Sequence, residues 1–415
     1  MHCANIVIVQ ITAILKALIQ KQFNTNHQLI ENSVAVNDGL FTGTLGVALY
    51  YINLYKAFGK QEYALMAIQH TEVVLANINS NKQLLHGTSL CNGTCGLAYL
   101  LTQLNELQLI DAEALQLIVE LDNTLYHVAI KLLTIHNNDL LHGAMGIVFY
   151  YLQKIPNTII YNYCYNLLTL FCNNAVYTSN GIWFKNLVVA YDKETDINLS
   201  LSHGQSGFLV TLAMAYNNGI KLTIIPTLLQ QGINFILQYR QQPSEANYNS
   251  HFPSIIQANK CQYTQRLAWC YGDLNVVLAI LEANKITNNK NEINLANDIG
   301  IATISRSTLL AIAATDSHIC HGTTGLALQY YKLYQLTTIK AYYTAWVHWL
   351  QLTAKELLPQ ELNTKYYSNK ATSLLEGLVG VNLPHLLVSK ASKLEYYFII
   401  IIKKILWHLP YTQLL

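Results

Sequence analysis

The sequence has few charged residues and almost no excess of either sign. Asp, Glu, Lys and Arg make up 12% of its 415 residues, and the formal net charge is +2; about a quarter is usual for a soluble domain. With no basic stripe, nucleic acid is excluded as a main partner. Hydrophobic residues reach 52%, which favours helices that are covered on most sides rather than amphipathic ones.

Long apolar runs are also missing. A membrane-spanning helix needs roughly 18 to 20 apolar residues, and the most apolar run, residues 396–402, ends at Lys403 and Lys404. We expect this run to lie in a terminal helix packed on the domain, with at most peripheral membrane association. Residues 1–22 have neither a basic leader nor a small-residue cleavage site, so no signal peptide is expected. The eight cysteines are then expected as free thiols or metal ligands in a reducing cytoplasm.

A short glycine motif recurs along the chain and predicts the architecture. Six copies of Gly-x-x-Gly and a seventh with Asn275 in place of the second glycine are separated by 50, 50, 61, 68, 50 and 55 residues. One copy alone would be an ordinary turn, but seven in register indicate a repeat protein. The first glycines are Gly43, Gly93, Gly143, Gly204, Gly272, Gly322 and Gly377.

Each turn is followed by an apolar run long enough for a helix, and most are preceded by another helical pattern. The following helices are expected at residues such as 45–57, 146–152, 274–281 and 326–336, and the preceding ones at 6–19, 121–135, 228–239 and 342–358. The repeat therefore predicts an all-α fold of seven helix pairs forming a single domain over residues 1–415.

The two longest spacings leave room for insertions. Residues 180–200 contain Gly181, Trp183, Val188 and Val189 in an extended-looking stretch, which predicts a small β-hairpin. Residues 241–265 are polar and contain proline, so a long loop is expected there.

The residue before each first glycine is always polar. Helix capping explains Thr42, Asn92 and Glu376, but histidine and tyrosine are not typical caps. If the helices after the turns form a closed ring, their N-terminal ends should gather at one mouth, where the helix dipoles favour anions. The full series is Thr42, Asn92, His142, His203, Tyr271, His321 and Glu376.

One position further back, Cys270 and Cys320 occupy the same place in neighbouring repeats, and His321 follows Cys320 directly. Two isolated cysteines would ordinarily be small buried hydrophobes. Two thiolates and one imidazole with a fourth position open are, however, a typical ligand set of catalytic zinc. Cys270, Cys320 and His321 are therefore the predicted zinc ligands. Cys91 has the same register in the second repeat, which is not adjacent, and we interpret Cys91 and Cys95 as structural.

The motifs Trp269-Cys270-Tyr271-Gly272, Cys320-His321-Gly322 and Ser202-His203-Gly204 resemble the lanthionine synthetase C-like family, the cyclases of lanthipeptide biosynthesis. All seven turns fit the family's repeat, so the resemblance covers nearly the whole chain. It implies an α/α toroid with one zinc ion held by the three predicted ligands. The catalytic residues that it implies are His203, Asp139, Arg266 and Tyr271.

The resemblance also implies the reaction: a peptide cysteine thiol adds to a dehydroalanine or dehydrobutyrine and closes a thioether ring. Zinc would favour the thiolate, and His203 or Tyr271 would protonate the product enolate. Arg266 would stabilise its charge, and Asp139 would orient His203. Two alternatives stay open: Arg266 could form a salt bridge with Asp273 or Glu245, and Asp139 could be a capping carboxylate.

Three functions are compatible with these observations to different degrees. The first is a zinc-dependent cyclase acting on a dehydrated precursor peptide in the cytoplasm, with a dehydratase and an exporter as expected further partners. The second is a non-cyclase family member that holds zinc and binds glutathione or thiol-bearing proteins. The third, a toroidal prenyltransferase, needs an acidic metal ligand and a cationic diphosphate pocket, and the Cys-His-Gly motif supplies neither.

Overall fold

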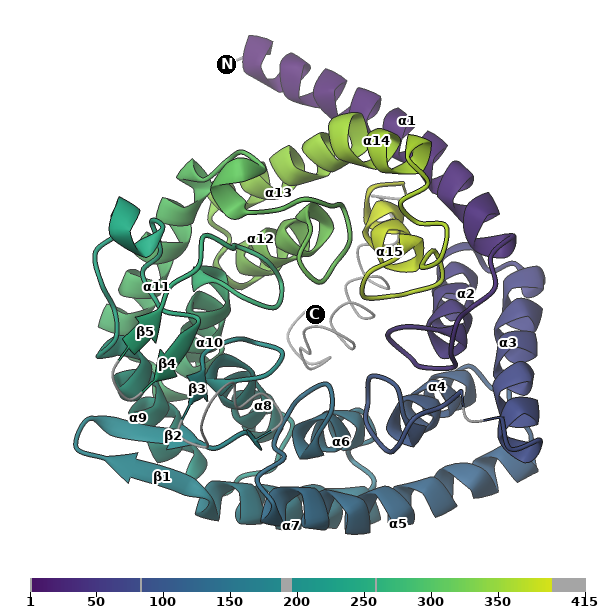
Figure 1. Ribbon diagram of the computed structural model, residues 1–415, viewed down its shortest axis with the longest axis horizontal. Coiled ribbons are helices and arrows are strands. Elements are labelled where there is room, and N and C mark those ends of the chain that lie inside the picture. The colour runs from purple at the N-terminus through teal and green to yellow at the C-terminus, as the bar shows by residue number, and fades with distance from the viewer. Residues whose placement is uncertain (1, 83, 188–195, 258–259, 390–415) are drawn as a thin grey trace. The chain divides into compact units, whose positions relative to one another are not determined.

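Helices make up most of the structure, a computed structural model that describes residues 2–82, 84–187, 196–257 and 260–389 (Figure 1). A helix begins directly after the first glycine of every predicted turn, as the repeat predicts. These helices are α2 (Thr44–Phe58), α4 (Thr94–Glu106), α6 (Ala144–Leu152), α8 (Gln205–Asn217), α10 (Asp273–Thr287), α12 (Thr323–Thr337) and α15 (Leu378–Ser389).

A second helix precedes each turn, which confirms the prediction of seven pairs. These helices are α1 (His2–Glu31), α3 (Gln61–Asn79), α5 (Ala112–Thr134), α7 (Thr158–Asn173), α9 (Ile225–Leu237), α11 (Lys290–Ala302) and α13 (Lys340–Leu352). The helix expected at 342–358 is interrupted: α13 runs into a π-helical turn, η5 (Thr353–Leu357), and then into α14 (Leu358–Asn363). Pro359 in the first turn of α14 lacks a backbone N–H, which favours this break in the α-helical hydrogen bonding.

The two sets of helices differ in burial. Every residue of α6 is buried, whereas the longer α5 buries only a stripe that includes Ile118, Leu125 and Ala129. The helices after the turns are thus covered on most sides, as their all-round apolar composition predicts. Paired tyrosines such as Tyr150 and Tyr151 are among the largest fully buried side chains.

The first glycine of the turns is required by close backbone approach. A Cβ at Gly43 would lie 1.9 Å from the carbonyl oxygen of Asn37, and the backbone N–H of Thr44 donates to that same oxygen at 3.0 Å. Only a residue without a side chain fits there. Gly272 has a second reason, because its φ of 118° is one that other residues rarely adopt.

The chain divides into two compact units. Among the described residues, the first comprises those within 1–85, 315–332 and 343–389, and the second comprises those within 86–314 and 333–342. In the first unit, the backbone N–H of Cys320 donates to Leu375 O (3.0 Å) and that of Leu375 donates to Phe41 O (2.9 Å), so the seventh turn contacts both the sixth and the first. In the second unit, Cys91 N–H donates to Leu141 O (3.0 Å) in the same register.

Side chains reinforce these contacts between repeats. In the first unit, Asn382 of α15 donates to Phe23 O and to the Tyr50 hydroxyl, both at 3.1 Å, and accepts from Asn26 at 2.9 Å. In the second unit, Asn275 accepts a hydrogen bond from Leu201 N–H (2.8 Å) and donates to Ala268 O (3.1 Å). The asparagine that breaks the glycine repeat therefore joins two neighbouring turns.

Two small sheets interrupt the helices. The strands β1 (Ala175–Thr178) and β2 (Gly181–Phe184) form an antiparallel hairpin in which Thr178 lies opposite Gly181. The predicted hairpin is confirmed in kind but begins before residue 180, and Val188 and Val189 lie outside the described residues.

The prediction of a long loop over residues 241–265 was wrong in part. That segment contains the short helix η2 (Glu245–Asn247) and the strands β4 (Ile255–Gln257) and β5 (Lys260–Gln262). β4 pairs with β5 and with β3 (Ile197–Asn198), all antiparallel. Strands of two or three residues are too short to show a period of two, and β3 comes from a distant part of the sequence, so no local pattern predicts this sheet.

None of the helices described here is long and apolar enough to cross a membrane. The terminal helix expected around residues 396–402 lies outside the described part of the chain.

Candidate metal centre and active site

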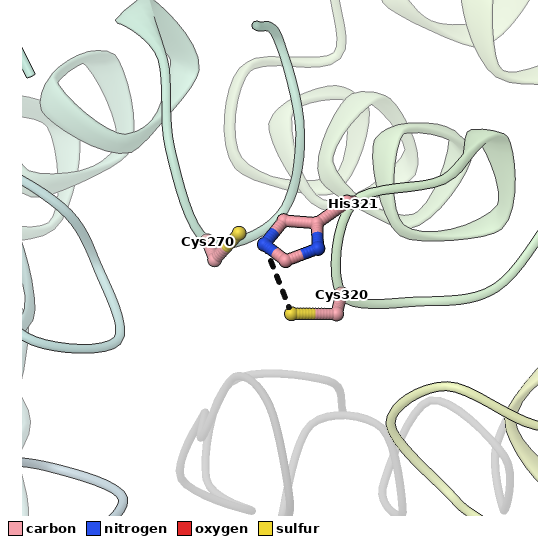
Figure 2. Close-up of side chains that lie close together, drawn as sticks. All are labelled: Cys270, Cys320 and His321. Atoms are coloured by element: carbon pink, nitrogen blue, oxygen red, sulfur yellow. Dashed lines mark hydrogen bonds between the residues drawn. The ribbon is translucent and has the colours of Figure 1, made fainter. Parts of the chain in front are cut away.

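The three predicted metal ligands lie close together. Cys270 is in the turn before α10, and Cys320 and His321 are in the turn before α12. Their two Sγ atoms and a ring nitrogen of His321 all lie within 4.8 Å of one another (Figure 2). The Sγ atom of Cys320 is 3.5 Å from Nε2 of His321. The side chains that the sequence selects by register are thus near enough to share one ion.

The donor set fits zinc. Sulfur and imidazole nitrogen are the ligands that Zn²⁺ takes in proteins, whereas Mg²⁺ and Ca²⁺ require oxygen. Cys270 and Cys320 are only 2% and 8% exposed, so two thiolates there would need a cation to offset the cost of buried charge.

Other cysteines have the surroundings of packing residues. Cys95 is fully buried and its Sγ lies 3.8 Å from Gly146 O. Burial raises the pKa values of the Cys95, Cys164 and Cys172 thiols, which keeps them protonated and unreactive. These features agree with the structural interpretation of Cys95. Among the cysteines whose side chains the structure describes, none forms a disulfide.

His203 and Asp139, both predicted as catalytic, are in direct contact. Nδ1 of His203 lies 2.8 Å from Oδ2 of Asp139, whose side chain is fully buried, while that of His203 is 19% exposed. Oδ1 of Asp139 also accepts the backbone N–H groups of Leu141 and His142, both at 2.9 Å. Asp139 therefore fills both roles left open by the sequence, since it caps its own turn and also holds the imidazole.

The charge on Asp139 is stabilised in spite of its burial. Burial raises its pKa, but the hydrogen bond and charge of His203, the N–H of His142 and the amide of Asn186 together lower the pKa below its ordinary value. An ionised Asp139 fixes the proton of His203 on Nδ1 when the imidazole is neutral. Nε2 is then the ring nitrogen available for proton transfer.

Two further residues neighbour this pair, and only one of them, His142, belongs to the polar series predicted from the sequence. Nδ2 of Asn186 donates to Oδ2 of Asp139 (3.0 Å) and to the backbone oxygen of His203 (2.9 Å). The ring of His142 lies parallel to that of His203, with centroids 5.9 Å apart, and burial lowers its pKa. Asn186 follows β2 outside the repeat register, so no sequence signal points to it, whereas His142 occupies the polar position before Gly143.

Tyr271 contacts the turn that carries His203. Its hydroxyl accepts a hydrogen bond from Nδ2 of Asn198 at 3.3 Å, and Oδ1 of Asn198 accepts the N–H of Ser200 at 2.7 Å. The phenol is therefore connected through one asparagine to the turn that ends at His203.

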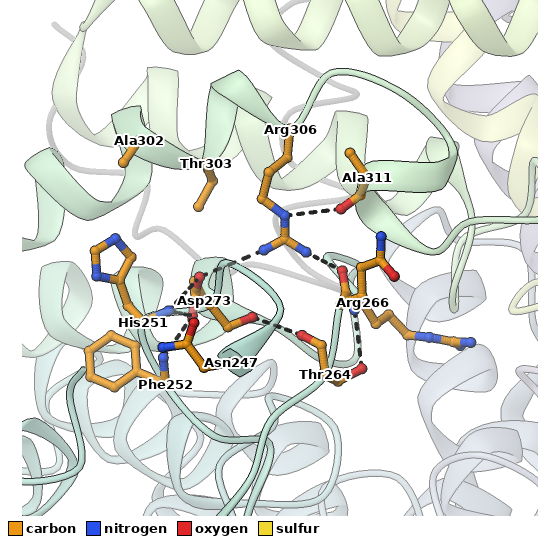
Figure 3. Close-up of polar contacts among 12 residues, drawn as sticks. Asn247, His251, Phe252, Thr264, Arg266, Asp273, Ala302, Thr303, Arg306 and Ala311 are labelled. Atoms are coloured by element: carbon orange, nitrogen blue, oxygen red, sulfur yellow. Dashed lines mark hydrogen bonds and ion pairs between the residues drawn. The ribbon is translucent and has the colours of Figure 1, made fainter. Parts of the chain in front are cut away.

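The salt bridge considered for Arg266 is not formed. Asp273 pairs instead with Arg306, at 3.8 Å, and the Arg266 side chain extends away from that pair (Figure 3). Within the described residues, Arg266 forms no ion pair with Glu245 or Asp273, while its backbone N–H donates to Thr264 Oγ1 at 3.1 Å. Its guanidinium is therefore not committed to either predicted carboxylate.

Comparison with known proteins gives two matches. The family model described as lanthionine synthetase C-like protein matches residues 34–398. A solved structure titled "Nisin cyclase" covers 93% of this chain, and this chain covers 97% of it, with 18% identity and a TM-score of 0.70. A search of curated proteins found no match. The structural likeness confirms the predicted fold class, an all-α fold of the α/α toroid type, and the family match establishes that the chain belongs to the lanthionine synthetase C-like family.

Proposed function

We propose that this protein is a zinc-dependent lanthipeptide cyclase. It would add cysteine thiols of a dehydrated precursor peptide to dehydroalanine or dehydrobutyrine and so close lanthionine or methyllanthionine rings. The observation that supports this most directly is the proximity of Cys270, Cys320 and His321, whose ligand atoms lie within 4.8 Å of one another, in a member of this family.

Cys270, Cys320 and His321 would hold one zinc ion and leave a position open for the substrate. Zinc bound there would supply the means of deprotonating a peptide thiol at neutral pH, where a free thiol is mostly protonated. The low exposure of both cysteines would keep water from competing at the sulfur atoms. The part of these residues is to hold and orient the nucleophile.

His203 would supply the proton that completes the addition. The sulfur forms a bond to the β-carbon, the carbon–carbon π bond breaks, and its electron pair moves to the enolate. The proton from Nε2 of His203 then reaches the α-carbon. The proton that the thiol released to solvent is balanced by one that His203 takes back from solvent, so that S–H has been added across the double bond. Asp139, 2.8 Å from Nδ1, keeps the ring oriented so that Nε2 is the nitrogen that takes part in the proton transfer.

Arg266 and Tyr271 would act on the charge that develops at the carbonyl oxygen. A guanidinium is a permanent cation with planar donors, and a phenol can donate a hydrogen bond to an enolate. Both residues are on the loop that carries Cys270, so they would act near the reacting thiol. The single domain, the cytoplasmic location, and a dehydratase and an exporter as partners stay predictions.

The test is ring closure by the purified protein. A dehydrated peptide that contains one cysteine is incubated with the zinc-loaded protein, and remaining thiols are alkylated and counted by mass spectrometry. We expect the alkylated fraction to fall with time for the wild type. For His203→Ala we expect a rate lower by about 10² to 10⁴-fold, the usual contribution of a general acid.

His86→Ala is the matched control, because His86 is an exposed histidine outside the proposed site, and it should close rings at the wild-type rate. Wild-type protein that holds zinc but leaves every peptide thiol open to alkylation would refute the cyclase proposal and favour the thiol-binding alternative.

A further inference from the structure

Three residues of the proposed site share one short loop. Arg266, Cys270 and Tyr271 lie between Gln265, which follows β5, and Asp273, the first residue of α10. Inside the loop, Ala268 N–H donates to Tyr271 O at 2.8 Å. Contacts from outside the loop also fix it, and they come from the segment that follows α11.

Arg306 contacts both ends of this loop. It follows the short helix η3 (Thr303–Ser305), and its side chain is almost fully buried. Nη2 donates to the backbone oxygen of Gln265 at one end, and Nη1 pairs with the Asp273 carboxylate at the other, 3.8 Å away (Figure 3). Nε donates to Ala311 O at 3.1 Å, which anchors the guanidinium to the segment that contains η4 (Leu310–Ile312).

The same segment holds the loop by further bonds. Leu267 N–H donates to Ile312 O at 3.2 Å, and the side chain of Gln265 donates to Leu310 O at 2.6 Å. These contacts place residues 306–312 along the loop as a scaffold, from which the Arg306 side chain reaches both ends.

Asp273 is a fixed partner for this arginine. Its carboxylate is fully buried and accepts the backbone N–H groups of His251 and Phe252, both at 3.0 Å on Oδ1. The guanidinium uses three nitrogens on three separate partners, which the compact ammonium of lysine cannot do.

We propose that Arg306 is a positioning residue, which fixes the loop of residues 265–273 and thereby the placement of Arg266, Cys270 and Tyr271. It acts through the loop and touches neither substrate nor metal. The consequence for zinc depends on the function proposed above, whereas the bracing of the loop does not.

The test compares Arg306→Lys with Arg240→Lys in the full-length protein. Arg240 is exposed. It is the matched control because the chain contains three arginines, and the third, Arg266, belongs to the proposed site. Hydrogen exchange is followed in peptides that cover residues 266–272, and zinc affinity is measured by competition with a chromophoric chelator. For Arg306→Lys we expect exchange of the Leu267 and Ala268 amides to be faster by about ten-fold or more, with peptides from α8 unchanged. Zinc affinity should fall by about 10 to 100-fold.

The proposal would be overturned if Arg306→Lys left hydrogen exchange in residues 266–272 unchanged, or speeded it evenly over the whole second unit. It would also be overturned if the loop exchanged faster while the zinc affinity of the variant stayed that of the wild type. If Arg306→Lys does not fold, Asp273→Asn keeps the shape of the partner and removes its charge, and the same local loosening is expected. If the wild type binds no zinc and Arg306→Lys still speeds exchange only in this loop, the role of Arg306 in fixing the loop stands. The proposed function is then refuted.

Discussion

A single buried carboxylate, Asp139, holds the proposed proton donor. It contacts His203 at 2.8 Å and receives two backbone N–H groups and the amide of Asn186. Because each donor interacts better with the charged form, the folded protein keeps Asp139 ionised although the side chain is fully buried. Its charge is therefore a contribution to stability as well as to the site.

Replacing Asp139 by Asn should reveal this contribution through its pH dependence. The folded-state pKa lies below the ordinary value of 3.8, so the stabilisation is complete above pH 3.8 and is lost as the pH falls through the folded-state pKa. At pH 7 the variant should lose about 3 kcal/mol of unfolding free energy, because one partner of a buried pair has been removed. Urea unfolding of the wild type and of Asp139→Asn between pH 7 and pH 3 measures the difference between their free energies of unfolding. This difference should become smaller as the pH approaches 3.

A difference that stays constant down to pH 3, or that grows as the pH falls, would show that the charge on Asp139 is not what stabilises the fold.

At this scale the sequence predicts the residues that lie in register and misses those outside it. Cys270, Cys320 and His321 were found because equivalent positions of a repeat must be spatially equivalent. Asn186 lies in an insertion and Arg306 in the connection between α11 and the next turn, where a single polar side chain has no pattern around it. Their importance depends on contacts that only the folded chain forms.

Among the elements, the turn before each helix explains both the repeat and its exception. The first glycine has no alternative, since a Cβ at Gly43 would overlap Asn37 O. The second glycine is replaced by Asn275 near the start of α10, and the side chain of Asn275 accepts a hydrogen bond from Leu201 N–H and donates one to Ala268 O.

Restoring the repeat by Asn275→Gly should therefore destabilise the protein. The change leaves one buried N–H and one buried C=O without their partners, and each such group costs about 1 to 3 kcal/mol. We expect the free energy of unfolding in urea to fall by about 3 kcal/mol.

Asn123→Gly, at an exposed position of α5 where the side chain accepts a hydrogen bond from the Tyr163 hydroxyl at 3.3 Å, controls for the helix propensity of glycine and should cost about 1 kcal/mol at most. A variant Asn275→Gly as stable as the wild type would mean that the repeat pattern, rather than the observed hydrogen bonds, determines this position.

The helices after the turns were predictable because each is an apolar run that begins directly after a glycine. The strands β3, β4 and β5 were not, because each has at most three residues and β3 pairs with a partner far along the sequence. The π-helical turn at residues 353–357 depends on local competition for hydrogen bonds next to Pro359, which composition alone does not predict.

For the whole molecule, the repeat predicts the fold class because every copy imposes the same local geometry. The seventh turn bonds to the first through Leu375 N–H and Phe41 O, so the first and last turns of the series are adjacent within the first unit. The sequence could suggest this contact only from the number of copies and the family resemblance, since no residue pattern encodes which turns meet.

The central claim is that two turns of neighbouring repeats hold one zinc ion, and metal content tests it most directly. The wild type, Cys320→Ala and Cys91→Ala are purified under reducing conditions, loaded with zinc, freed of excess metal and analysed for zinc per chain. Cys91 has the same register in another repeat and is equally buried, so it controls for the loss of a packed thiol. We predict one zinc ion per chain in the wild type and in Cys91→Ala, and far less in Cys320→Ala. Wild-type protein without zinc, or full occupancy in Cys320→Ala, would contradict the account.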